Sequence, residues 1–177
     1  IVRCMVEEKI GVVDHYFTHI NVAAIKITDG ELKIGEPIAT TVIHAVKTHI
    51  SKNGLNILDA PPGTACPVLE TMKESDYLIL VTEPTPFGLH DLAMTVDVVR
   101  ELGIPLGVII NRAGIGDDGV VNYCKENDIE ILMEIPFDRH IAELYSRGVP
   151  FVQEMPEWRQ KFKDLFNHIE RLIKNAK

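Results

Sequence analysis

The fold is decided by the run Tyr77-Leu78-Ile79-Leu80-Val81-Thr82 and by two later runs of the same kind, Leu106-Gly107-Val108-Ile109-Ile110-Asn111 and Ile129 to Ile135. Each run is apolar almost throughout and is closed by a polar residue or a proline, as is typical of strands buried on both faces of a sheet. An earlier run, Leu55-Asn56-Ile57-Leu58-Asp59, is shorter and ends in an acid. These patterns predict four strands.

Stretches with helical spacing separate these runs. Between the second and third runs, apolar residues recur every three or four positions, and Gly103 is a suitable stop. Four more helices are expected at residues 38–50, from Val120 to Cys124, from Ile141 to Tyr145, and from Glu157 to Asn175. Strands that alternate with helices predict an α/β fold, a doubly wound and mainly parallel sheet with right-handed crossovers.

The composition sets limits on the class of protein. A length of 177 residues predicts one domain, 1–177, with a hairpin-like segment at about 1–36 built around the turn Asp29-Gly30. Lys plus Arg number 18 against 26 Asp plus Glu, a net charge of −8, which argues against a nucleic-acid partner. Apolar runs all fall short of the ~18 residues of a membrane span. Three scattered cysteines favour a reducing, cytoplasmic compartment.

The polar residues that follow the predicted strands are the candidate site. Ligands of open parallel sheets bind at the carboxyl ends of the strands. Four segments occupy such positions: Asp59 to Gly63, Thr82 to Gly88, Asn111-Arg112, and Pro136-Phe137-Asp138.

The strongest local motif is Asn56-Ile57-Leu58-Asp59-Ala60-Pro61-Pro62-Gly63-Thr64. An acid at the tip of a buried strand has the form of a Walker B site, whose carboxylate orders the water shell of Mg²⁺. A glycine four residues later allows a backbone N–H to approach a terminal phosphate. The alternative interpretation is that Asp59 caps a helix that begins near Ala65.

Two longer strings carry a family resemblance, Leu58-Asp59-Ala60-Pro61-Pro62-Gly63-Thr64-Ala65-Cys66-Pro67 and Val81-Thr82-Glu83-Pro84-Thr85-Pro86-Phe87-Gly88-Leu89-His90-Asp91-Leu92. They resemble the MinD/Mrp-type P-loop ATPases, the CobQ/CobB/MinD/ParA-like group, and most of all the subgroup with an inserted ferredoxin-like module. The resemblance continues through Gly107 to Arg112 and Glu134 to Asp138, and spans roughly residues 30–150. It implies a sheet of the P-loop NTPase type, incomplete here at the N-terminal side.

The resemblance also implies a function and roles for residues. It implies binding of ATP or ADP with Mg²⁺, ATP hydrolysis, and a nucleotide-dependent oligomer. Asp59 would be the Walker B carboxylate that holds Mg²⁺ through water, and Gly63 would lie in the switch that senses the γ-phosphate. Asn111 would read adenine, for which its carboxamide offers an acceptor and a donor together.

The remaining candidate residues follow from the same resemblance. Pro136, Phe137 and Asp138 would line the base pocket, with Arg112 beside Asn111. Thr82 and Glu83 open the loop and helix, residues 82–92, that would lie near the nucleotide or the oligomer interface. The ferredoxin-like module of the subgroup implies a link to iron–sulfur or redox metallocentres and a ferredoxin-like or metalloprotein partner.

One family feature does not occur in this sequence. It contains no Gly-x-x-x-x-Gly-Lys-Ser/Thr loop and no Gly-Lys pair at all. That loop supplies the phosphate cradle, the lysine and the Mg²⁺ hydroxyl. The cysteine clusters of the inserted module are missing too, and a cluster needs about four cysteine ligands. Because the chain also opens at Ile1, we expect the carboxyl-terminal portion of such an ATPase, inactive in hydrolysis alone.

Two further hypotheses remain open. The first is a non-catalytic interaction or scaffold domain that kept the fold, lost the P-loop and uses the helix after Gly88 as its surface. The second is a dinucleotide-binding oxidoreductase, because Gly114-Ile115-Gly116-Asp117-Asp118-Gly119 matches G-x-G-x-x-G. Against the second, Asp117 and Asp118 would repel a pyrophosphate and are better explained as first-turn acids of a helix.

The missing P-loop strand has a structural consequence. Without it, strands of this fold keep unpaired backbone edges. We therefore expect an oligomer or a partner chain that completes the sheet, or residues 1–6 acting as a substitute strand.

Overall fold

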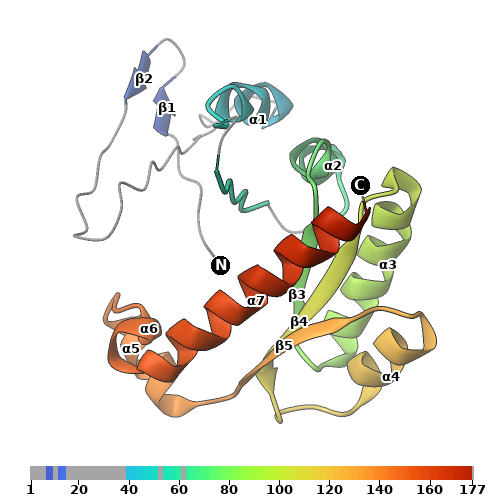
Figure 1. Cartoon of the computed structure of the whole chain (residues 1–177), viewed down its shortest axis with the longest axis vertical. Helices are drawn as coiled ribbons and strands as arrows, with labels where there is room; N and C mark the ends of the chain where they lie inside the picture. The colour runs from blue at the N-terminus through green and yellow to red at the C-terminus, as the bar shows by residue number, and fades with distance from the viewer. Residues whose placement is uncertain (1–6, 10–11, 15–38, 52–53, 61–62, 177) are drawn as a thin grey trace. The chain divides into compact units, whose positions relative to one another are not determined.

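A computed structural model describes residues 7–9, 12–14, 39–51, 54–60 and 63–176 (Figure 1). Contacts between Cα atoms divide the chain into two compact units, Ile1–Lys73 and Glu74–Lys177, and each is described by itself.

The first unit is built from short elements. Strands β1 (Glu7–Lys9) and β2 (Val12–Asp14) pair antiparallel, and helices α1 (Ala39–Lys47) and α2 (Cys66–Met72) follow. The side chain of Lys47 joins the two helices, because its Nζ donates to the carbonyl oxygens of Glu70, at 2.9 Å, and Lys73, at 2.7 Å. This contact satisfies carbonyls that α2 leaves unpaired at its end. The expected turn at Asp29-Gly30 and the expected substitute strand at 1–6 lie outside the described residues.

The expected strand at Leu55–Asp59 is wrong in this structure, because residues 55–60 form neither helix nor strand. Leu55 is 62% exposed and Ile57 is 39% exposed. The carboxamide of Asn56 exchanges two hydrogen bonds, each of 2.9 Å, with the backbone of Ser51, which closes a local loop. In the part of the chain that the structure describes, this segment has no partner strand. Without a ladder, an apolar run gains little from an extended conformation.

The second unit contains a parallel sheet of three strands in the order β3-β4-β5, and this confirms the predicted fold class. Its strands are β3 (Leu78–Thr82), β4 (Leu106–Ala113) and β5 (Ile131–Pro136). Leu78 pairs with Leu106, and Val108 pairs with Ile131, with irregularities in the second ladder after Val108 and after Ile110.

Helices connect and cover this sheet. They are α3 (Pro86–Leu102), α4 (Gly119–Glu126), α5 (Arg139–Ser146), α6 (Phe151–Glu154) and α7 (Pro156–Ala176). The helices expected from apolar spacing are therefore present in this unit. Only the short α6 was not predicted.

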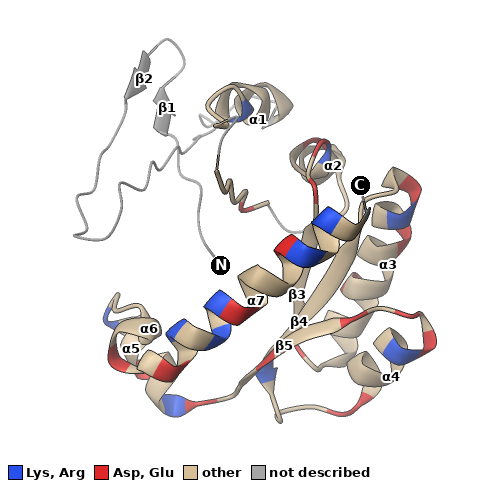
Figure 2. Cartoon of the chain, in the orientation of Figure 1, with Lys and Arg blue, Asp and Glu red and all other residues tan. Residues whose placement is uncertain are grey.

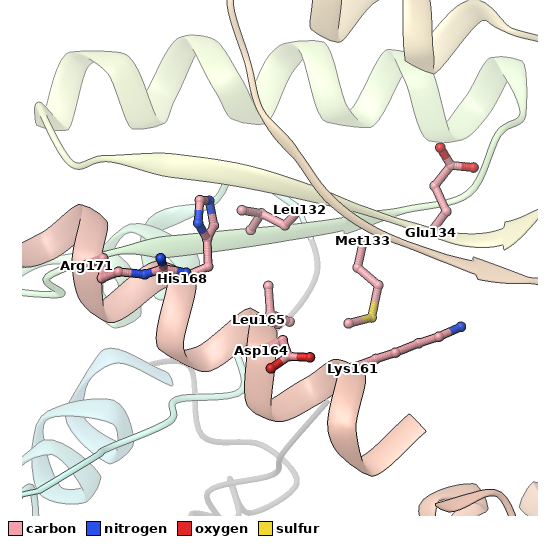
Figure 3. A pocket seen from close by; sticks show the side chains of 8 residues that line it. All are labelled: Leu132, Met133, Glu134, Lys161, Asp164, Leu165, His168 and Arg171. Carbon is pink, nitrogen blue, oxygen red and sulfur yellow. The ribbon is translucent and has the colours of Figure 1, made fainter. Parts of the chain in front are cut away.

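The core of this unit lies between the sheet and the two crossover helices. Val108 and Ile110 of β4 pack with Val96 of α3 and with Val120 and Cys124 of α4. Helix α7 lies on the opposite face, and Figure 3 shows the strands running between α3 and α7. Both crossover helices share one face because the strands follow one another in sequence order and right-handed connections return to the same side.

Strand β3 is less covered than β4. Ile79 is 43% exposed and Val81 is 46% exposed, whereas Val108 and Ile110 of β4 are buried. Among the described residues, β3 pairs only with β4 and so forms one edge of the sheet. This edge agrees with the expectation that the sheet is incomplete.

Candidate functional site

The carboxyl ends of the three parallel strands lie at one edge of the second unit. Thr82 is in register with Ile110, directly before Asn111, and Ala113 is in register with Pro136. The structure therefore brings together the candidate residues of this unit. They are Thr82, Glu83, Asn111, Arg112, Pro136, Phe137 and Asp138.

The end of β3 is tied to the first turn of α3. The hydroxyl of Thr82, which is only 9% exposed, donates to the carbonyl oxygen of Gly88 at 2.9 Å. The hydroxyl of Thr85 accepts from the backbone N–H of Gly88 at 3.0 Å and so caps the helix. A Cβ atom at Gly88 would approach the carbonyl oxygen of Glu83 to 2.2 Å. Only glycine fits here, so this loop has a defined shape.

An ion pair joins the ends of β3 and β4. The Arg112 guanidinium lies 3.5 Å from the Glu83 carboxylate, and both side chains are partly exposed. The backbone of Arg112 has φ 54°, in the left-handed region that residues other than glycine seldom adopt. A kink therefore follows Asn111, which is itself half-buried. Within the described part of the chain, the Asn111 carboxamide makes no hydrogen bond, whereas the Arg112 side chain is held by Glu83.

The end of β5 is held against β4 and opens α5. The backbone N–H of Phe137 donates to the carbonyl oxygen of Ala113 at 3.0 Å, while the Phe137 side chain is 58% exposed. The carboxylate of Asp138 accepts from the backbone N–H of His140 at 2.7 Å and caps α5. Asp138 thus has a structural task, and the Phe137 side chain is an exposed apolar surface at the end of β5.

Sequence reasoning missed the contact between the loops that follow β3 and β4. A Cβ atom at Gly116 would lie 1.4 Å from the carbonyl oxygen of Pro84, so the two loops touch backbone to backbone. The glycines of the segment 114–119 match a dinucleotide motif in the sequence. In the structure, Gly116 is a glycine because its backbone lies against the Pro84 carbonyl, where a side chain would not fit.

The same segment argues against the dinucleotide hypothesis. A pyrophosphate at the start of α4 would need free backbone N–H groups. The Asp117 carboxylate instead accepts from the N–H of Gly119 at 2.9 Å. Gly116 packs against Pro84, so the segment 114–119 contacts the loop that follows β3.

Asp59 and Gly63 belong to the first unit and are described apart from the strand ends. The side chain of Asp59 is exposed, and Gly63 has φ 95°. Cys66 is exposed at the start of α2, whereas Cys124 is buried in the core, and burial raises the pKa of its thiol. Within the described ranges, no group of three or more His, Cys, Asp or Glu side chains could hold a metal ion.

Ionisation at the opposite end of the sheet is also perturbed. Burial, and then the negative charge of Glu130, raise the pKa of Tyr77 to about 12. Tyr77 directly precedes β3 and so lies at the amino ends of the strands. It is therefore not part of the candidate site at their carboxyl ends. None of the helices within the described residues is both long and apolar enough to cross a membrane.

The chain is similar to proteins of a known family. Residues 24–173 match the ParA family model that is described as NUBPL iron-transfer P-loop NTPase. An uncharacterised protein of Methanocaldococcus jannaschii is 34% identical over 81% of this chain and 48% of its own length. An iron-sulfur cluster carrier protein of the same organism is 26% identical over 68% of this chain and 47% of its own. The chain thus spans about half the length of these curated relatives.

A solved structure shares the fold. It is the septum site-determining protein MinD of Pyrococcus horikoshii, complexed with Mg-ADP, with a TM-score of 0.66 and 25% identity. The similarity covers 89% of this chain and 68% of that one.

Proposed function

This chain belongs to the ParA/NUBPL-type P-loop NTPase family, and from that premise we propose that it forms the base-binding part of an adenine-nucleotide site. The observation that carries the proposal is the meeting of three strand ends at one edge of the sheet, with Asn111 on the central strand and the exposed side chain of Phe137 directly after the neighbouring strand. The Asn111 carboxamide would pair with the N6 and N7 edge of adenine, and Phe137 would supply apolar contact for the base.

The neighbouring residues would shape this pocket. The ion pair between Glu83 and Arg112 would fix the two strand ends relative to each other, and Thr82 would hold the loop before α3. Pro136 and Asp138 would form the wall on the side of β5. Asp138 caps α5 and thereby fixes the direction in which the chain leaves β5.

Phosphate and metal binding need groups other than those at the strand ends. Asp59 carries an exposed carboxylate, an oxygen ligand of the kind that Mg²⁺ prefers, and would hold the ion through water, with Gly63 near the γ-phosphate. The 177 residues contain no Gly-Lys loop. ATP hydrolysis would therefore require a phosphate-binding loop from other polypeptide, and we expect this chain alone not to hydrolyse ATP.

We further propose that the nucleotide cycle serves the handling of an iron–sulfur cluster as cargo. Support comes from the curated relatives named iron-sulfur cluster carrier proteins. The chain has three cysteines, of which Cys124 is buried in the core, whereas a cluster is commonly held by about four. A partner or a second copy would have to contribute thiolates.

Calorimetric titration of the chain with Mg-ATP, Mg-ADP, Mg-GTP and NADH tests the nucleotide proposal. We expect adenine nucleotides to bind more tightly than Mg-GTP, and Asn111→Ala to abolish this preference. Asn122→Ala, on the exposed face of α4, is the matched control and should preserve it. Binding of NADH without binding of adenine nucleotides would instead support the oxidoreductase hypothesis.

One observation favours the second candidate function, a non-catalytic interaction domain. Phe87, in the first turn of α3, is 84% exposed, an unusual degree for so large an apolar side chain. Absence of any nucleotide binding, together with capture of a partner that Phe87→Ser abolishes, would favour this function over the nucleotide site.

A further inference from the structure

An open groove of about 510 Å³ lies between β5 and α7, away from the strand ends (Figure 3). Leu132 and Met133 of β5 and Leu165 of α7 give it an apolar floor. Three consecutive residues of β5, 132–134, line it. Leu132 is the extra residue at the irregularity between β4 and β5, which interrupts the alternation of side chains and lets neighbouring residues of β5 line one groove.

The backbone of β5 is available at that edge. In the part of the chain that the structure describes, β5 pairs with β4 alone and is the second edge of the sheet. On such an edge the outward N–H and C=O groups form a template for another strand. An apolar groove therefore lies beside a strand that is at the edge of the sheet among the described residues, and an added extended segment needs these two features.

The charges on the α7 side have a definite arrangement. Lys161 and Arg171 mark the two ends of the groove, and Asp164 and His168 lie between them. Asp164 accepts from the side chain of Gln160 at 2.9 Å, and His168 is 2.8 Å from the carboxylate of Glu130. Lys161 lies over the Trp158 ring, and Arg171 donates from Nε to the Asn167 carbonyl.

Lys161 and Arg171 thus place a positive charge at each end of the groove, with the Asp164 carboxylate between them. Figure 2 shows that α7 carries both signs of charge, although the whole chain is acidic, with a net charge of −8. Glu134, on the β5 side, points away from α7 in Figure 3. A segment that lies between β5 and α7 thus meets a positive group at each end.

The spacing of these cations fits an extended chain. Ten helical residues separate Lys161 from Arg171, about 15 Å along the axis of α7. Four residues of a strand cover about 13 Å, and residues two apart share a face. An extended segment with acids at positions i and i+4 and an apolar residue at i+2 would place all three side chains toward α7.

We propose that this groove binds an extended acidic segment of a partner protein, which adds to β5 as a further strand. Its apolar side chain would pack on Leu132, Met133 and Leu165, and its two carboxylates would pair with Lys161 and Arg171. The site does not depend on the nucleotide proposal, because no strand-end residue takes part.

Fluorescence anisotropy with a labelled, acetylated Thr-Glu-Thr-Val-Thr-Glu-Thr peptide and the whole 177-residue chain tests the proposal. We expect saturable binding that weakens as salt is added. The double variant Lys161→Glu/Arg171→Glu should weaken it by about tenfold or more, since each acid of the peptide then faces a like charge. Lys163→Glu, an exposed residue of α7 outside the groove, is the matched control and should leave the affinity unchanged. Circular dichroism checks that all variants are folded.

Four results would overturn the proposal. They are absence of saturation, equal binding of the peptide in which lysines replace the glutamates, an equal loss in Lys163→Glu, and displacement of the peptide by self-association of the chain. The last result, detected by analytical ultracentrifugation, would identify a second copy as the occupant.

Discussion

Strand β3 and the segment Leu55–Asp59 carry similar sequences and have different structures. Both are short apolar runs followed by an acid and by prolines. Residues Leu78–Thr82 pair with β4 over their whole length, whereas residues 55–59 form a loop closed by Asn56 and Ser51. The difference teaches that an apolar run becomes a strand when a partner ladder is present, and that the sequence of the run does not determine this by itself.

The largest loss of stability is expected when a core side chain of β4, the strand that pairs with β3, is truncated. Ile110→Ala removes a side chain that is 2% exposed in the middle of the core and should lower the free energy of unfolding by about 2–5 kcal/mol. Urea unfolding monitored by the fluorescence of Trp158, which is in the same unit, measures it.

Ile57→Ala, in the unpaired segment, is the control and should change that free energy by less than about 0.5 kcal/mol. Equal losses for the two variants would mean that residues 55–59 are buried and paired in solution, contrary to the comparison.

A smaller effect is expected where the two loops of the site touch. Gly116→Ala forces a Cβ atom onto the Pro84 carbonyl, so the backbone must shift, at a cost of about 1–3 kcal/mol. Ile115→Ala, at the exposed neighbouring position, should cost far less. Thermal unfolding by circular dichroism compares them, and an unchanged midpoint for Gly116→Ala would show that the loops are apart.

The cap of α3 contributes less again. Thr85→Ala removes the acceptor of the Gly88 N–H and should lower the free energy of unfolding by about 1 kcal/mol. Thr85→Ser keeps the hydroxyl and should restore most of that loss. Chemical denaturation of the three proteins gives the comparison, and a serine variant as unstable as the alanine variant would exclude the cap as the cause.

The smallest effect concerns alkaline pH. The pKa of Tyr77 is raised from 10.0 to about 12 in the folded chain, chiefly by burial, so the neutral phenol is favoured there. Its stabilising contribution is complete below about pH 10 and is lost as the pH rises toward 12. The wild-type urea midpoint should therefore fall between about pH 9 and about pH 11 by more than that of Tyr77→Phe. Parallel midpoints would show that Tyr77 ionises as in an unfolded chain.

Much of the second unit follows from the sequence. The apolar runs near residues 78–82, 106–113 and 131–136 predict the strands, and the spacing up to Leu102, with Gly103 after it, predicts α3. These signals suffice because each element buries a periodic face against its neighbours in sequence. The apolar run at 55–59 also predicts a strand, but none forms there, because strand pairing depends on residues distant in the sequence.

Parts of the candidate site depend on contacts that no local pattern encodes. The sequence predicts that Asn111 and Phe137 lie at the same edge of the sheet, because parallel strands share their direction, and the register of β4 and β5 agrees. The approach of Gly116 to Pro84 and the left-handed backbone of Arg112 arise between loops distant in sequence. The roles proposed for Asp59 and Gly63 rest on the resemblance and stay predictions.

The central claim is that the strand ends around Asn111 bind the adenine base, and a backbone NMR titration with Mg-ADP tests it most directly. The account predicts saturable chemical-shift changes at Asn111, Arg112 and Phe137, with none at Tyr77 or Glu130 at the other end of the sheet. Mg-GDP should produce much smaller changes. Saturable shifts confined to Gly114–Gly119, or an equal response to both nucleotides, would contradict the claim.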